Sequence, residues 1–288
     1  MMKVLITGAT GNVGMEVIAS LNKINHQLAL FAGVRDTNFS NEQLARFNIK
    51  TINFDFTLID TFAPALQNMD LLFLLRPPQI SDVNKYFAPL IEIAKLSSVK
   101  HIVFLSVQGV QNSKIIPHHK IEKLIVNSNI PYTFLRPAYF MQNFTTTLRN
   151  DLVKHQIIYL PAAHAKFTII DLVDVGNVTA NILTEPQHHI NKSYELTNTE
   201  TLTFSQMAEK LSKAIGKKIN FISPNLLQFF WRKRKEKVPT MLIFVMIMLH
   251  YFPRFQKTPS TTEWVNKITG QEPTSFDTFV AANKNQLQ

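Results

Sequence analysis

Hydrophobic positions in residues 3–137 fall into short, wholly apolar runs that alternate with amphipathic stretches. Leu71–Leu75 and Ile102–Leu105 are apolar at every position, which is typical of parallel strands that helices cover on both faces. This alternation predicts an α/β fold with a doubly wound parallel sheet flanked by helices. The predicted strands are Lys3–Thr7, Leu28–Arg35, Lys50–Asp55, Leu71–Leu75, His101–Ser106 and Tyr132–Arg136, and the predicted helices are Val13–Lys23, Leu58–Asn68, Asp82–Ser97 and His118–Ser128.

The pattern becomes less regular after Pro137. Thr203 and Gln206 have the spacing of a capping box, and Gly216 is suited to end the helix that follows. We predict a larger domain over residues 1–150, onto which segments near 165–185 pack, and a smaller, mostly helical lobe over 151–288. The remaining predicted elements are helices Met141–His155 and Val173–Thr184, strands Ile157–Leu160, Phe167–Ile170 and Ser193–Leu196, and three helices within Pro224–Gln288.

Composition supports a folded chain with a sizeable core. Of the 288 residues, 45% are hydrophobic and 17% are charged, which excludes general disorder. Cysteine is absent, so disulfides, cysteine-ligated metals and thiol nucleophiles are excluded. No carboxylate pattern accompanies His164, His188 or His189, and we expect no metal site. Met1–Ile6 lead into a strand pattern rather than a secretory signal, so we expect a cytoplasmic location.

The net charge of +10 raises the question of a polyanionic partner. The charge is even, with 14 Lys and Arg against 9 Asp and Glu in residues 1–150 and 16 against 11 in 151–288. The dense run Arg232–Lys237 is interpreted as a solvated face rather than a surface for nucleic acid or membrane. The apolar run Met241–Leu249 is well short of the ~20 residues of a membrane span, and we expect a helix that covers a pocket or an interface. We therefore expect no nucleic acid partner and no membrane span.

Three of the eight glycines lie between the first predicted strand and the first helix, at Gly8, Gly11 and Gly14. Glycines at this point let a pyrophosphate approach the backbone N–H groups at the start of a helix. The strand before and the helix after them strengthen an otherwise weak motif. We predict a dinucleotide site with contacts from Gly8, Thr10, Gly11, Asn12, Val13 and Gly14.

The end of the second strand bears on which dinucleotide is bound. A carboxylate there would favour NAD, whereas an arginine can pair with the 2′-phosphate of NADP. The sequence has Arg35 followed by Asp36, so we expect NADP (NADPH), with NAD as the alternative. Further cofactor contacts are expected at the ends of the third and fourth strands, from Asp55 and Phe56 beside the adenine and from Leu75 and Arg76.

Several motifs together resemble the NmrA-like family of atypical short-chain dehydrogenases/reductases, up to about residue 222. This resemblance implies a Rossmann domain with a small substrate lobe and an NAD(P) cofactor. The family contains quinone, azo-dye and triphenylmethane reductases as well as cofactor-binding regulators that sense redox state. The matching segments are the G-x-x-G-x-x-G loop, Phe104–Val110, His118–Lys123, Ile130–Asn143, Phe167–Val175 and Tyr194–Thr197.

The chain departs from the family pattern where short-chain dehydrogenases carry Tyr-x-x-x-Lys. Lys114 occupies the place of the tyrosine and His118 that of the lysine. Hydride transfer to a quinone or dye does not need a matched enzyme acid, because water can protonate the product. The resemblance implies cofactor contacts from Ser106, Val107, His118, Pro137, Tyr139 and Phe140, catalytic roles for His118, Ser106 and Tyr139, and substrate contacts from Tyr139, Phe140 and Asn143.

Some of these roles have alternatives. His118 could orient the nicotinamide ribose, donate a proton, or simply begin a helix. Ser106 could hydrogen-bond the ribose or a substrate carbonyl, Tyr139 could act as a substitute acid, and Phe140 could belong to the core.

Two functions therefore remain for the whole chain. The leading hypothesis is an NAD(P)H-dependent oxidoreductase that transfers a hydride to a quinone-like, dye-like or other flat carbonyl acceptor. Its partner would be a small apolar or aromatic substrate in a pocket walled by Tyr139, Phe140 and the apolar C-terminal helices. The alternative is a non-catalytic redox sensor that passes NAD(P) occupancy to a regulatory protein partner. A homodimer is compatible with either.

Overall fold

The computed structural model describes residues 1–288, apart from the side chains of Phe39 and Asn41. The chain divides into two compact units, each formed from three segments. Unit 1 comprises Met1–Pro137, Leu172–Leu196 and Trp264–Glu272, and unit 2 comprises Ala138–Asp171, Thr197–Glu263 and Pro273–Gln288. The sequence pattern predicted a domain boundary at residue 150. In the structure the chain leaves unit 1 after Pro137 and returns to it twice.

Within the described part of the chain, unit 1 is built on a sheet of seven parallel strands in the order β10-β6-β5-β4-β1-β2-β3. This confirms the predicted doubly wound sheet. The order reverses between β1 and β4, which is the point at which such sheets bind ligands. The strands are β1 (Met2–Ile6), β2 (Leu28–Val34), β3 (Lys50–Asn53), β4 (Leu71–Leu75), β5 (His101–Leu105), β6 (Tyr132–Pro137) and β10 (Lys192–Leu196).

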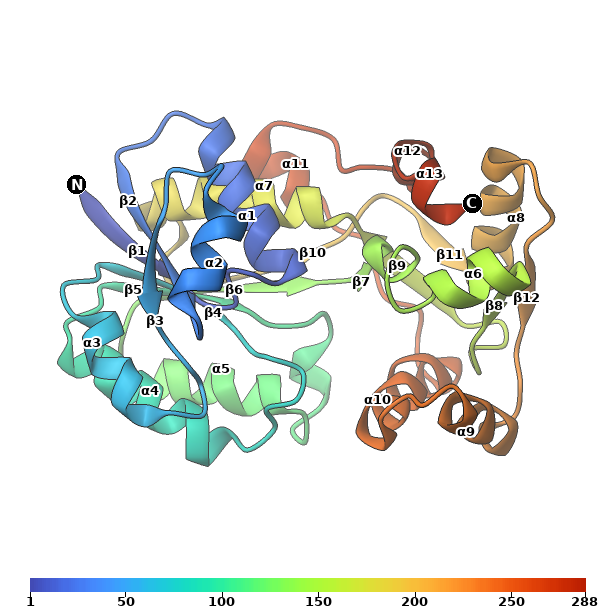
Figure 1. Cartoon of the computed structure of the whole chain (residues 1–288), viewed down its shortest axis with the longest axis horizontal. Coiled ribbons are helices and arrows are strands. Elements are labelled where there is room, and N and C mark those ends of the chain that lie inside the picture. Colours follow the sequence, from blue (N-terminus) through green and yellow to red (C-terminus); the bar gives the residue numbers. More distant parts are fainter. The chain divides into compact units, whose positions relative to one another are not determined.

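Helices cover both faces of this sheet, with α1 and α7 on one face and α3, α4 and α5 on the other (Figure 1). The contact between α1 and α7 is close at Gly176, where a Cβ atom would lie 2.6 Å from Ser20 Oγ. Together with the pairing of β10 with β6, it explains why residues 172–196 belong to unit 1. The helices are α1 (Asn12–Lys23), α2 (Thr37–Leu44), α3 (Phe62–Leu66), α4 (Val83–Leu96), α5 (Pro117–Ser128), α7 (Leu172–Thr184) and α11 (Trp264–Thr269).

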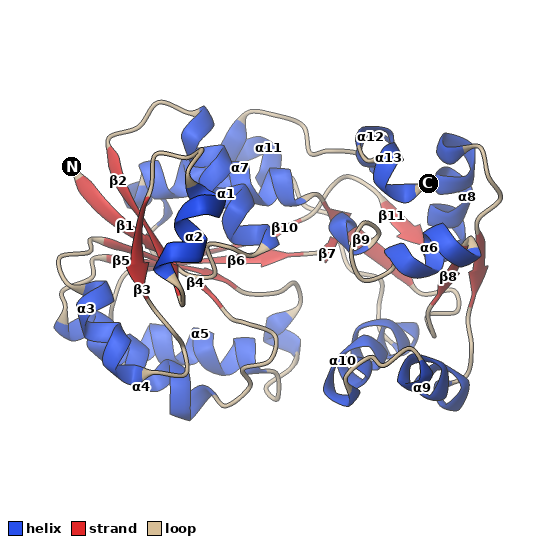
Figure 2. Cartoon of the chain, viewed as in Figure 1, coloured by secondary structure: helices blue, strands red, loops and turns tan.

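Unit 2 combines two small sheets with helices (Figure 2). The capping box at Thr203 is confirmed, and Gly216 ends α8 with a left-handed φ of 79°. One sheet holds β7 (Tyr139–Phe140), β9 (Lys166–Ile170) and β11 (Thr201–Thr203), the other β8 (Ile157–Tyr159) and β12 (Asn220–Ile222), and the helices are α6 (Arg149–His155), α8 (Phe204–Ile215), α9 (Leu226–Lys235), α10 (Thr240–Tyr251), α12 (Phe276–Ala282) and α13 (Lys284–Leu287).

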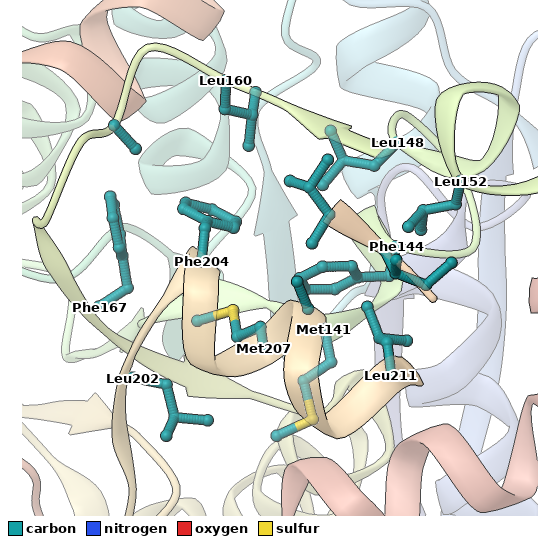
Figure 3. Close-up of a cluster of buried hydrophobic side chains, with 14 of the residues drawn as sticks. Met141, Phe144, Leu148, Leu152, Leu160, Phe167, Leu202, Phe204, Met207 and Leu211 are labelled. Atoms are coloured by element: carbon teal, nitrogen blue, oxygen red, sulfur yellow. The ribbon is translucent and has the colours of Figure 1, made fainter. Parts of the chain in front are cut away.

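The core of unit 2 gathers around α8. The side chains of Phe204, Met207 and Leu211, spaced by three and four residues, lie with Met141 and Phe144 in one buried cluster (Figure 3). All five side chains are fully buried. The cluster gives unit 2 a hydrophobic core of its own, as an independently stable unit requires.

Two predicted helical regions differ from the structure. The helix expected over Met141–His155 is a 3₁₀ turn at Met141–Asn143 followed later by α6. The hydroxyl groups of Thr145 and Thr146 donate to the carbonyl oxygen of Gln142, and such local bonds compete with a regular helix. Residues 224–288 form the five helices α9 to α13 instead of three; Pro253 lies in the interruption after α10, Gly270 follows the end of α11, and Asn283 separates α12 from α13.

The basic run Arg232–Lys237 is only partly the solvated face that its composition predicts, because Arg234, Lys235 and Lys237 are exposed whereas Lys233 is buried. Lys233 is 4% exposed, and its Nζ lies 2.7 Å from Asp151 Oδ2 and 2.7 Å from Glu236 Oε2. Arg232 pairs with the same two carboxylates and lies over the ring of Tyr159. The start of the run is therefore a buried ion-pair network that ties α9 to α6.

None of the helices among the described residues combines the length and apolar character that crossing a membrane requires.

Candidate functional site

The loop from β1 to α1 has a backbone that only glycine allows at two of its three glycine positions. Gly8 has a φ of +63°, in the left-handed region. A Cβ atom on Gly14 would lie 2.2 Å from the Gly8 carbonyl oxygen. Gly11 donates to that oxygen at 3.0 Å and precedes α1, so no capping side chain covers the first amides of this helix. Exposed amides at a helix start are suited to bind an anion.

Thr7 fixes this loop to the neighbouring strand. Its hydroxyl group donates to the carbonyl oxygen of Phe73 at 3.1 Å and accepts from the amide of Leu75 at 2.9 Å. The Leu75 side chain packs against Gly8, where a Cβ atom would lie 2.9 Å from Leu75 Cδ2. The glycine loop is thereby placed at the reversal between β1 and β4. Thr7 is not among the predicted site residues, although its hydroxyl group directly before the glycines was a signal in the sequence.

Arg35 and Asp36 follow β2 and have different surroundings. Arg35 is exposed and has no ion-pair partner among the residues that the structure describes. Asp36 Oδ1 accepts from the amide of Asn38 at 3.0 Å, and its carbonyl oxygen accepts from Ser40. The carboxylate of Asp36 therefore helps to shape the turn into α2, and the guanidinium of Arg35 remains available for a ligand.

Asp55 and Phe56 lie beyond the end of β3. Asp55 Oδ1 accepts from the amide and hydroxyl groups of Thr57, both at 2.8 Å. Phe56 is 6% exposed, and its ring meets that of Phe54 edge to face with centroids 4.9 Å apart. Because the Phe56 ring is in the core, a ligand at this position would meet mainly its backbone.

The loop after β5 contains an unpaired hydroxyl group. Ser106 is 2% exposed, and its Oγ has no hydrogen-bond partner among the described residues. Three groups farther along this loop donate to the carboxylate of Glu195, which lies on β10. They are Gln108 Nε2, the backbone amide of Gly109 and Gln111 Nε2, at 3.0–3.4 Å. The backbone amide of Gln108 also donates to the carbonyl oxygen of Pro137 at 3.0 Å. Glu195 thus holds the loop that carries Ser106 and Val107, a role that no local sequence signal indicated.

His118 lies in the first turn of α5 and receives a hydrogen bond from Arg76. Arg76 Nε donates to His118 Nε2 at 3.4 Å, which leaves the ring proton on Nδ1. Burial, with a smaller effect of Arg76, lowers the pKa of His118 to about 3. His118 is therefore neutral near pH 7 and offers no imidazolium proton. The bidentate pair of Arg136 with Glu122 fixes α5 against β6.

Arg76 is held by backbone oxygens at the end of β4. Its Nη1 donates to the carbonyl groups of Pro77, Pro78 and Ile80 at 2.7–3.1 Å. These bonds fix the guanidinium beside the ring of His118, at the carboxyl end of the sheet.

The predicted residues Tyr139, Phe140 and Asn143 belong to unit 2. His250 Nδ1 lies 2.6 Å from the carbonyl oxygen of Met246 and must donate to it, so His250 Nε2 accepts from the Tyr139 hydroxyl at 3.2 Å. Burial raises the pKa of Tyr139, an effect that its hydrogen bond with Asn143 opposes. The Tyr139 hydroxyl group keeps its proton and uses it in the hydrogen bond to His250. Phe140 is half-buried.

The low pKa values of three buried histidines predict that the stability of the fold depends on pH. Burial lowers the pKa of His101 and of His250 to about 4, and that of His118 to about 3, from 6.5 in the unfolded chain. As the pH falls below 6.5 the unfolded chain binds protons that the folded chain does not. Stability is therefore full above pH 6.5 and falls toward pH 4, by about 1.4 kcal/mol per pH unit for each histidine.

Urea titrations at pH 7, 6 and 5 measure this slope. The variant His101→Gln should reduce it, whereas His188→Gln, at an exposed position, should leave it unchanged. A free energy of unfolding that stays constant from pH 7 to pH 5 would contradict the prediction.

The described residues contain no group of three or more His, Asp or Glu side chains that could hold a metal ion. The groups of unit 1 that could hold a ligand at this edge of the sheet are backbone amides, the orphan hydroxyl of Ser106 and cationic side chains.

Comparison with known proteins gives a consistent result. The model of the NmrA-like family matches residues 1–252. Prestalk A differentiation protein A of Dictyostelium discoideum is 29% identical over 280 residues, covering 96% of this chain and 91% of its own. The NAD(P)H azoreductase of Xenophilus azovorans is 28% identical over 286 residues, or 97% of both chains. Quinone oxidoreductase 2 of Escherichia coli is 28% identical over 221 residues, or 76% of both chains.

Among solved structures, Citrobacter sp. triphenylmethane reductase complexed with NADP(H) matches with a TM-score of 0.84. The match covers 100% of both chains at 23% sequence identity. At this identity the likeness shows a shared fold.

Proposed function

The chain belongs to the NmrA-like family, and from this premise we propose that it is an NAD(P)H-dependent oxidoreductase that reduces a quinone-like or dye-like acceptor. The observation that carries the proposal is the uncapped start of α1 behind Gly8, Gly11 and Gly14, with the free Arg35 at the end of β2.

The residues of unit 1 fit a bound dinucleotide. The loop Gly8–Gly14 would hold the pyrophosphate, because a Cβ atom at Gly14 cannot be accommodated and the amides of α1 are open. Arg35 would pair with the 2′-phosphate, and Asp55 with the backbone of Phe56 would meet the adenine end. The orphan Ser106 hydroxyl would hydrogen-bond the nicotinamide ribose or a substrate carbonyl. Leu75, Arg76, Val107, His118 and Pro137 would complete the contacts.

The protonation states of His118 and Tyr139 favour an acceptor that does not need an acid from the enzyme. The nicotinamide, when bound in its reduced form, supplies a hydride. His118 is neutral, and the Tyr139 hydroxyl group already donates its hydrogen bond to His250. A quinone or dye can take its proton from water, so binding and orientation suffice. Ser106 is then an orienting residue, and acid roles for His118 and Tyr139 are disfavoured.

The relatives support the same acceptor class and cofactor. An azoreductase and a quinone oxidoreductase are related to this chain over most of its length. The similar triphenylmethane reductase was solved with NADP(H), which supports NADPH as the preferred cofactor, with NAD as the alternative. Substrate contacts from Tyr139, Phe140 and Asn143, a homodimer and a cytoplasmic location stay predictions.

The variant Arg35→Ala tests the cofactor assignment. Loss of a charge-assisted bond of about 1.5–3 kcal/mol should weaken NADPH binding by roughly 10- to 100-fold and leave NADH binding unchanged. Titration with each nucleotide, followed by nicotinamide fluorescence, measures both affinities.

Arg46→Ala is the matched control, because it removes another exposed arginine close in the sequence. Equal losses for NADPH and NADH would refute the pairing of Arg35 with the phosphate. The activity itself is tested by NADPH oxidation with a soluble quinone and an azo dye. Binding without turnover on either acceptor would favour the redox sensor over the reductase.

A further inference from the structure

Helix α10 of unit 2 has an apolar outer side. Its inner side carries Ile243, Met246 and His250, which are buried, and the His250 bond to Tyr139 holds the helix in place. The outer side, here called the α10 face, consists of six exposed apolar residues, Met241, Leu242, Phe244, Val245, Met248 and Leu249.

The exposure of the α10 face is unusual in extent. Met241 is 68% exposed, and Phe244, Met248 and Leu249 are each a little over half exposed. Thr240 is the one exposed polar residue among the described residues of α10. Single exposed apolar residues are normal, but a contiguous apolar patch of this kind marks a surface that binds something.

The apolar surface continues beyond α10. On α9, Trp231 is 62% exposed, and Phe230 joins the two helices through a ring contact with Phe244 at 5.9 Å between centroids. Figure 1 shows α9 and α10 next to each other, and Phe255 follows α10 with an exposure of 69%. Large exposed aromatic side chains thus occur both on the neighbouring helix α9 and directly after α10.

Basic residues without a carboxylate partner among the described residues precede and follow α10. Arg234 and Lys235 end α9, Lys237 lies between α9 and α10, and Arg254 and Lys257 follow α10; all five are exposed. Segment 226–257 holds seven Lys and Arg against one acidic residue, Glu236, which is paired with Arg232 and Lys233. Within the described residues, none of these five cations has a carboxylate partner.

This charge pattern indicates which kind of partner would cover the α10 face, a second copy of the chain or a lipid surface. A second copy of the chain would bring the same cations together across a symmetric interface, which opposes association. An anionic lipid surface offers an apolar layer for the α10 face and negative charge for these cations. Helices that lie in a membrane interface combine these same features, an apolar face with aromatic residues and flanking Lys and Arg.

We propose that the α10 face docks on a bilayer that contains anionic lipids, with α10 lying in the plane of the interface. The contact is peripheral and reversible. Apolar side chains enter the boundary between headgroups and acyl chains, and the basic residues remain among the headgroups.

Vesicle sedimentation tests the proposal with the full chain. Binding is expected to phosphatidylcholine vesicles that contain 30% phosphatidylglycerol, and it should be at least about tenfold weaker without phosphatidylglycerol or in 0.5 M salt. The double variants Phe244→Asp with Met248→Asp and Lys235→Glu with Lys237→Glu should each reduce binding by about tenfold or more. Leu96→Asp is the matched control, because Leu96 is 75% exposed on α4, in unit 1.

Far-UV circular dichroism and thermal unfolding show whether each variant is folded, and NADPH binding should stay unchanged in all of them. The proposal is overturned if the wild-type chain does not bind anionic vesicles, or if the Phe244 and Met248 double variant binds like the wild-type chain. It is also overturned if the chain is a dimer without lipid and this variant is a monomer, since the α10 face would then belong to a second copy.

Discussion

Replacing Asp151 with asparagine is expected to lower the free energy of unfolding of unit 2 by about 3–5 kcal/mol. Asp151 is 3% exposed and lies 2.7 Å from Lys233 Nζ and 2.8 Å from Arg232 Nη2. Asparagine keeps the size of the side chain but leaves the buried ammonium of Lys233 with Glu236 alone. Urea titration followed by the fluorescence of Trp231, on the same helix, measures the change.

Asp277→Asn is the matched control for this prediction. Its carboxylate also pairs with a lysine, Lys210, but it is 63% exposed, so the expected cost is below about 1 kcal/mol. A double variant, Asp151→Leu with Lys233→Met, should recover much of the stability, because it removes both buried charges. Equal costs for Asp151→Asn and Asp277→Asn would show that the network contributes no more than a surface pair.

Gly14→Ala is expected to weaken NADPH binding on the order of 100-fold, about 2.7 kcal/mol. The added methyl group would lie 2.2 Å from the Gly8 carbonyl oxygen and 2.7 Å from Ala9 Cα. Both are backbone atoms of the loop that would hold the pyrophosphate, so either the loop or the start of α1 must move. Isothermal titration with NADPH measures the loss.

Gly270→Ala separates this local effect from a general cost of replacing glycine. Gly270 has a φ of +70° and no atom within 4 Å of its would-be Cβ, so alanine should cost about 1–2 kcal/mol of stability through backbone strain. NADPH affinity should not change in this variant. If Gly14→Ala binds NADPH within threefold of the wild-type chain, the loop does not hold the pyrophosphate as proposed.

The parts of the molecule that the sequence predicted are those set by local patterns. The apolar runs of β4 and β5 predicted buried parallel strands, and both strands are buried along most of their length. The glycine loop was predicted from three glycines between a strand and a helix, and the structure shows at Gly14 a backbone approach that leaves no room for a Cβ atom. Local chemistry also predicted the two ends of α8.

The parts that were missed depend on contacts between residues distant in the sequence. Glu195 holds a loop 86 residues away, and nothing near Glu195 in the sequence indicates this. The burial of Lys233 follows from Asp151, 82 residues before it, so the composition of the basic run could not indicate that its start is buried. The tie between Tyr139 and His250 spans 111 residues and changes what the phenol can do.

The discontinuous path of the chain has a consequence for biosynthesis. Unit 1 lacks its last strand, β10, until Leu196 has been translated, and α11 comes later still. The ribosome therefore releases β6 as an open sheet edge while residues of unit 2 are being made. Unpaired edges of this kind are prone to bind other chains. The nascent protein would thus depend on chaperones or on slow translation until β10 closes the edge, and a gene cut at residue 150 would leave that edge open permanently.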